Sequence, residues 1–176
     1  MSDVTTALAI LVTSQEEVDK INGIRADHDR AYSRWMPHIN FLFPFVPVEE
    51  FDEYQKKLQE ALSGFGSFDL VLDQVGHFKQ RKAATFNLQP SDDSKLQELF
   101  NAVRAAIPEV QPKHPEFHPH LTIGQFKKFQ IAEKETELAQ WLGDGVKVRI
   151  DGVYMINRSK EDRDVPFSVN RMISLN

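Results

Sequence analysis

Residues 37–45 read PHINFLFPF and residues 119–126 read PHLTIGQF, so a pattern of Pro, His, an apolar residue and a polar residue occurs twice, 82 positions apart. Apolar and polar side chains alternate in both stretches, which is typical of a strand with one buried face. A second pair, FDLVLDQV at 68–75 and VKVRIDGV at 146–153, is separated by 78 positions. These matches predict a duplicated chain whose halves pack about a pseudo-two-fold axis, with the two histidine strands facing each other.

Hydrophobic patterning predicts strand, helix, strand, helix, strand in each half, followed by one last strand. Ser14 and Glu17 have the spacing of a helix capping box, and the helix that begins there must end before Pro37. Other helices are predicted over 51–65, 91–107 and 131–142, and other strands over 5–12, 83–88, 153–156 and 167–175.

The two sides of the histidine strands differ in character. Alternation places His38 and Asn40 on one side of the first strand, and His120 and Thr122 on one side of the second. His118 and Gly124 share the side of His120. The opposite side of the first strand is predicted to be core and carries Ile39, Phe41, Phe43 and Phe45. Elsewhere, the strands over 68–72 and 83–88 are predicted to form a hairpin.

Composition excludes several classes of protein. The chain has 176 residues, 41% of them hydrophobic, which predicts a single globular domain over residues 1–176. It has no cysteine, so a disulfide framework, a thiolate nucleophile and a cysteine zinc site are excluded. The apolar stretch over 7–12 is too short to span a membrane and lacks the basic flank of a signal peptide. We expect an intracellular protein, cytoplasmic or nuclear, with no membrane partner.

The net charge of −5 argues against binding long duplex nucleic acid, because such binding needs many Lys and Arg side chains against phosphates. A small nucleotide or an RNA end remains possible as substrate. Some basic side chains could still rim a cleft and attract phosphate, and Arg158 is the first candidate for that role.

The aromatic side chains, Phe78 among them, are assigned to the core by default. No apolar surface stripe is left over, so we expect a monomer.

Two facing histidines suit acid–base chemistry on a phosphodiester. With an ordinary pKa near 6.5, one imidazole can take the proton of the attacking oxygen while the other gives a proton to the leaving oxygen. An Asn amide and a Thr hydroxyl can donate hydrogen bonds to the non-bridging phosphate oxygens. His38 and His120 are therefore the candidate catalytic pair, with Asn40 and Thr122 as candidate substrate-binding residues. This chemistry requires neither a metal nor a cofactor, and we expect none.

The segments His-x-Asn-x at 38–41 and His-x-Thr-x at 120–123, in two halves of a chain of this size, resemble the two-histidine (2H) phosphoesterase superfamily. Their wider context, RWMPHINFLFPF at 34–45 and FHPHLTIGQF at 117–126, resembles its 2′-5′ RNA ligase-like and cyclic phosphodiesterase branch. The resemblance implies a bilobal α+β fold in which two antiparallel sheets line a central cleft and helices lie outside. It also implies metal-independent chemistry on 2′,3′-cyclic or 2′-5′ phosphodiester bonds. Asn40 stands where that family carries a hydroxyl residue.

Three alternative interpretations of the sequence remain open. His114, His118 and His120 could form a metal site, since alternate strand positions can place two imidazoles on one ion. The Asn at position 40 could instead mark a module that binds a nucleotide or phosphate without turning it over. Ligation is a third possibility, although the chain carries no Walker-type nucleotide-activation motif, and hydrolysis is therefore favoured.

Overall fold

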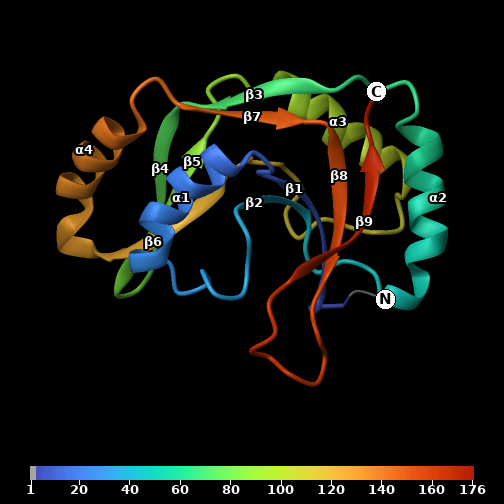
Figure 1. The fold of residues 1–176 in the computed structure, drawn as a ribbon, viewed down its shortest axis with the longest axis horizontal. Coiled ribbons are helices and arrows are strands. Elements are labelled where there is room, and N and C mark those ends of the chain that lie inside the picture. The colour runs from blue at the N-terminus through green and yellow to red at the C-terminus, as the bar shows by residue number, and fades with distance from the viewer. Residues whose placement is uncertain (1–2) are drawn as a thin grey trace.

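The computed structural model describes residues 3–176, which form four α-helices and three antiparallel sheets (Figure 1). The helices are α1 (Gln15–His28), α2 (Phe51–Ala61), α3 (Ser94–Ala106) and α4 (Ile131–Leu142), with short 3₁₀ turns at Val48–Glu50 and Lys128–Gln130. The strands are β1 (Thr6–Leu11), β2 (His38–Leu42), β3 (Phe68–Leu72), β4 (Gln74–Lys79), β5 (Ala83–Gln89), β6 (Leu121–Lys127), β7 (Val146–Ile150), β8 (Gly152–Asn157) and β9 (Ser168–Ser174). The predicted α+β class with antiparallel sheets is confirmed.

The sheets follow the sequence repeat. One lobe has strand order β2-β1-β8-β9 and the other β4-β5-β6, while β3 and β7 form a separate pair. In that pair Leu70 lies opposite Val148, and these are equivalent residues of the two repeats. Equivalent residues of an antiparallel pair can face each other only at a two-fold axis, so the pseudo-symmetry axis passes between them. The third, two-stranded sheet was not expected.

Each half of the chain contributes a strand to the other lobe. β4 follows β3 but pairs with β5, and β8 follows β7 but pairs with β1. The predicted hairpin between 68–72 and 83–88 is therefore wrong, since β3 pairs with β7. The cause is β4, whose mostly exposed or partly exposed side chains gave no hydrophobic alternation to reveal a strand there.

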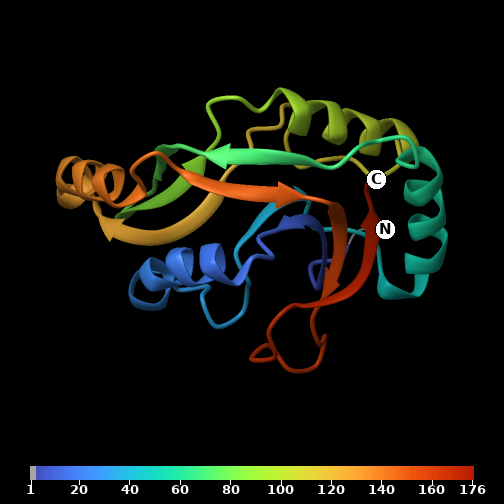
Figure 2. The same cartoon turned by 45° about the horizontal axis from the view of Figure 1, so that its top comes forward.

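The helices lie at the two ends of the molecule. α2 packs against α3 and β9 at one end, while α4 packs against β4 and α1 against β6 at the other. Figure 2 shows β3 and β7 side by side in the middle of the molecule, running in opposite directions between the two ends. α1 ends at His28, well before Pro37, and its predicted capping box does not form, because the Ser14 hydroxyl donates to the Glu17 carboxylate (2.7 Å) rather than accepting from a backbone N–H. No helix within residues 3–176 is long and apolar enough to cross a bilayer.

Both histidine strands contain a register shift immediately after their polar motif residue. Across β1 and β2, Ala9 lies opposite Asn40 while Leu8 lies opposite Leu42, so one residue of β2 is extra. Across β5 and β6, Asn87 lies opposite Thr122 while Phe86 lies opposite Gly124. Such bulges re-aim the residues that follow them and are frequent beside active sites. Their equivalent placement is independent support for the duplication.

These bulges overturn two predicted side-chain directions. Phe43 does not join the main core with Ile39, Phe41 and Phe45; it is partly exposed and packs in a second apolar cluster. Leu42 takes the core position instead. Gly124 does not share the side of His120, because it lies against α1, where an added Cβ would be 2.8 Å from the Cβ of His28.

Candidate active site

The two motif histidines are held in the same way. His38 opens β2, His120 immediately precedes β6, and these strands contact each other. Nδ1 of His38 lies 2.7 Å from the carbonyl oxygen of Met36, and Nδ1 of His120 lies 2.8 Å from that of His118. A carbonyl only accepts, so each Nδ1 donates and the neutral ring keeps its lone pair on Nε2. Both imidazoles can thus act as bases through Nε2.

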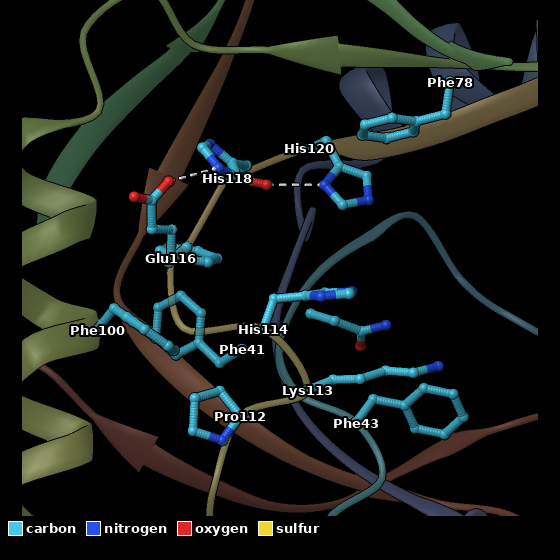
Figure 3. A pocket seen from close by; sticks show the side chains of 12 residues that line it. Phe41, Phe43, Phe78, Phe100, Pro112, Lys113, His114, Glu116, His118 and His120 are labelled. Carbon is cyan, nitrogen blue, oxygen red and sulfur yellow. Dashed lines mark hydrogen bonds and ion pairs between the residues drawn. The ribbon is translucent and has the colours of Figure 1, made fainter.

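His120 and Asn40 line a cavity of about 570 Å³. In Figure 3, His120 and Phe78 lie at one side of it, and Lys113 and His114 at the other. His38 and Thr122 lie outside this lining. The ring of Phe78, 47% exposed, meets His120 edge-on at 5.2 Å, so its default assignment to the core is wrong. The other lining residues are Phe41, Phe43, Phe100, Pro112, Glu116, Phe117 and His118.

His38 sits at the end of an aromatic column. The Trp35 ring stacks on the His38 ring, with centroids 4.4 Å apart and planes 17° apart, and on Phe167 at 3.8 Å. The guanidinium of Arg158 lies over Phe167, 5.7 Å from its centroid. Arg158 therefore reaches the column but is not among the residues lining the cavity. The Trp35 ring covers one face of His38, which is partly buried.

Burial lowers the pKa of His38 from 6.5 to about 4. The hydrogen bond to Met36 opposes this shift, the positive charges of Arg25 and His120 add to it, and the carboxylate of Asp29 opposes it. His38 is consequently neutral at pH 7, with Nε2 free to accept a proton. The two histidines share a hydrogen-bonding pattern but differ in their aromatic neighbours, since His38 stacks face to face with Trp35 whereas His120 meets the edge of Phe78.

The pKa of His38 predicts a loss of stability in mild acid. Unfolded His38 binds a proton near pH 6.5 and folded His38 only near pH 4, so the free energy of unfolding falls as the pH drops through this window. By pH 5 the part due to His38 is about 2 kcal/mol. Urea unfolding at pH 7 and pH 5 should show a smaller acid-induced loss in His38→Gln than in the wild type. Equal losses would contradict the assigned environment.

A buried ion pair holds the backbone of Trp35, the residue that stacks on His38. Arg25 is 2% exposed, and its Nε donates to Asp29 (2.9 Å) while its Nη2 donates to the carbonyl oxygen of Trp35 (2.8 Å). Asp29 also accepts from the side chain of Gln125 on β6 (3.4 Å), and Gln125 accepts from the backbone N–H of Arg30 (2.9 Å). These hydrogen bonds connect residues 29–37, the loop that carries Trp35 (the Trp35 loop), to α1 and to β6 of the other lobe.

Asn40 and Thr122 lie where the repeat predicted them, each two residues beyond its histidine. Both are partly buried, and Asn40 lines the cavity. The Oδ1 atom of Asn40 is buried without a hydrogen-bond partner. Thr122 lies opposite Asn87, which is fully buried. Asn87 does not stand out in the sequence, because it falls within the predicted apolar strand over 83–88. The alternation of Thr85, Asn87 and Gln89 with apolar residues was a signal that could have revealed this polar face.

Two histidines of the alternative metal site, His118 and His120, differ in solvent exposure. His118 is 77% exposed and lies 3.3 Å from the carboxylate of Glu116, whereas His120 is partly buried. Within residues 3–176 no three or more His, Asp or Glu side chains are grouped as a metal site would require.

Comparison with known proteins places the chain in a family. The sequence profile of the 2′-5′ RNA ligase superfamily matches residues 12–162. A Staphylococcus haemolyticus protein, a phosphoesterase by name, is 28% identical over 154 residues, covering 86% of this chain and 89% of its own.

Solved structures show the same fold. Escherichia coli LigT in complex with 3′-AMP has a TM-score of 0.65 at 16% identity and covers 98% of both chains. TT0787 of Thermus thermophilus has a TM-score of 0.62 at 15% identity and covers 97% of both. With the profile match extending over most of the residues and both histidine motifs inside it, the chain belongs to the 2′-5′ RNA ligase superfamily of two-histidine phosphoesterases.

Proposed function

We propose that the protein is a metal-independent phosphodiesterase that opens 2′,3′-cyclic or 2′-5′ phosphodiester bonds of nucleotides or RNA ends. The main support is the matched pair of imidazoles, each with Nδ1 committed to the carbonyl two residues earlier and Nε2 left free. Two such groups on contacting strands match the requirement of an in-line displacement for one base and one acid.

We assign the two roles from the different surroundings of the two rings. His38 is neutral at pH 7 because of its lowered pKa, so its Nε2 takes the proton of the attacking water as the new O–P bond forms. Protonated His120 gives its Nε2 proton to the leaving ribose oxygen as the old P–O bond breaks. The product is a phosphomonoester with a free hydroxyl, and proton exchange with water restores both rings.

Asn40 and Thr122 hold the phosphate in this proposal. An amide N–H and a hydroxyl can each donate to a non-bridging oxygen as negative charge builds up, which stabilises the transition state without a cation. Asn40 lines the cavity beside His120. The fold neighbour LigT holds 3′-AMP, so nucleotides with a single phosphate are the first ligands to test.

An assay panel tests the function. The wild-type protein is incubated with 2′,3′-cyclic nucleotides, 2′-5′-linked oligonucleotides and an ADP-ribose cyclic phosphate, with and without EDTA, and products are separated by chromatography. We expect turnover of 2′,3′-cyclic nucleotides at equal rates in both conditions. Loss of activity in EDTA would contradict the metal-independent mechanism.

The alternative function is a binding module, and Asn40 is the observation that favours it, because it replaces the hydroxyl residue of the family motif. Calorimetry with the same cyclic nucleotides separates the two. Binding without any product would favour the module, whereas product formation by the wild type would exclude it.

A further inference from the structure

Two buried side-chain atoms in the part of the chain that the structure describes lack a hydrogen-bond partner: Oδ1 of Asn40 and Nδ2 of Asn87. Buried polar groups in native proteins are nearly always paired, so each exception needs an explanation. Both belong to the strands around the candidate site, Asn40 to β2 and Asn87 to β5. Asn40 has a role in the proposed function, but Asn87 does not.

The surroundings of Asn87 fix the direction of its amide. Its side chain is fully buried, and its Oδ1 accepts from Nε2 of Gln89 at 2.8 Å. Gly76 on β4 leaves the room for this bond, because a Cβ there would lie 2.2 Å from that Nε2 and 3.0 Å from the Asn87 Oδ1. The Asn87 Oδ1 atom is therefore hydrogen-bonded on the side of β4. Because the oxygen and nitrogen of an amide point in different directions, Nδ2 is the atom directed toward β6. Directly opposite on β6 is Thr122.

The pseudo-symmetry allows the residue opposite each motif residue to be compared between the two lobes. In the first lobe the motif residue is Asn40, and the residue opposite it is Ala9. In the second lobe the motif residue is Thr122, and the residue opposite it is Asn87. In each lobe, one of the two facing residues is therefore an Asn: the motif residue itself in the first lobe, and the residue opposite it in the second. Asn40 brings its own N–H donors, whereas Thr122 has a single hydroxyl hydrogen that can point in several directions.

We propose that Asn87 is a positioning residue for Thr122: its Nδ2 donates to the Thr122 hydroxyl oxygen when substrate binds, so that the hydroxyl hydrogen points at the phosphate. A small rotation of the Thr122 side chain or one bridging water completes the contact. Directly opposed residues of an antiparallel pair have Cβ atoms about 5 Å apart, which is within that reach. This inference rests on the proposed function, because it needs Thr122 to bind phosphate.

A double-mutant cycle in kcat/KM for a 2′,3′-cyclic nucleotide tests the inference. Thr122→Val keeps the shape and removes the hydroxyl, and we expect a loss of about 10- to 100-fold. Asn87→Ala should lower kcat/KM by about 10-fold, mainly through kcat, because the hydrogen bond that the positioned Thr122 hydroxyl donates strengthens as negative charge builds up on the phosphate. In the Thr122→Val background, Asn87→Ala should cost nothing further. Losses that multiply in the double variant would overturn the proposal.

Two further variants separate positioning from a structural role. Asn87→Asp keeps the shape, but its carboxylate attracts the Thr122 hydrogen away from the phosphate, so it should lose more activity than Asn87→Ala. Gln89→Leu releases the Asn87 amide without emptying a buried site, and should cause a smaller loss that vanishes with Thr122→Val. Full activity in Asn87→Asp would overturn the proposal, as would a Gln89→Leu loss that persists with Thr122→Val.

Thr85→Ala is the matched control, since Thr85 lies on the same side of β5 but opposite Gln125, and its activity should be unchanged. Turnover by the wild type tests the proposed function separately from this inference. If the wild type binds a 2′,3′-cyclic nucleotide without turnover, the same cycle is measured in Kd, where non-additive losses support the positioning role and additive losses contradict it. A wild type that neither binds nor turns over these nucleotides would contradict both proposals.

Discussion

His38→Gln and His120→Gln should each lower turnover of a 2′,3′-cyclic nucleotide by about 10²- to 10⁴-fold, the range of a lost general base or acid. Glutamine can keep the hydrogen bond to the carbonyl two residues earlier, so the fold should survive. Steady-state kinetics, with melting temperatures as a check of folding, provide the measurement. His77→Gln is the matched control, because His77 pairs with Glu135 at 3.0 Å, points to the opposite side of β4 from Phe78 and is not among the residues lining the cavity.

The two variants should differ when the leaving group is changed. A nitrophenolate leaves without needing a proton, so a nitrophenyl phosphodiester should restore much of the activity of His120→Gln and little of that of His38→Gln. Equal recovery in both variants would contradict the assignment of His38 as base and His120 as acid. Wild-type activity in either variant on the natural leaving group would remove that residue from the mechanism altogether.

Arg25→Met should lower the free energy of unfolding by about 3–5 kcal/mol, because it leaves the Asp29 carboxylate buried without its partner. The variant should also lose activity, since Arg25 holds the carbonyl of Trp35 and Trp35 covers His38. Urea unfolding at pH 7 measures the change in stability.

Arg149→Met is the control for Arg25→Met. Arg149 pairs with Asp69 at 3.2 Å, but both side chains are about half exposed, and such a pair contributes about 0–1 kcal/mol. A similar small loss in Arg25→Met would show that the buried pair does not support the Trp35 loop as the structure indicates.

The sequence predicted the architecture through its repeat rather than through individual strands. The PHIN and PHLT matches correctly anticipated that β2 and β6 are equivalent and in contact, and the second match anticipated β3 and β7. It could not predict that β3 pairs with β7, because pairing between halves leaves no trace in local periodicity. Phe43 was misplaced because the one-residue bulge in β2 turns Leu42 into the core position that the alternation gave to Phe43.

The candidate site was predictable in its residues and not in its asymmetry. His38, Asn40, His120 and Thr122 could be selected because their spacing repeats. The contrast between the covered His38 and the more open His120 depends on Trp35, which the repeat matches to Phe117, an aromatic that packs on Phe100 instead. Nothing in the spacing distinguishes these two aromatic side chains, because their packing depends on tertiary neighbours, Phe167 for Trp35 and Phe100 for Phe117.

The exchange of β4 and β8 between lobes bears on how the chain folds. The β2-β1-β8-β9 sheet joins residues near the N-terminus to residues beyond 150, so it cannot be completed until nearly the whole chain has been made. Pairings of such large sequence separation raise the contact order, which slows folding because long loops must close before the contacts form. The two lobes are therefore expected to fold in one cooperative step, and neither half of the sequence contains all the strands of either lobe.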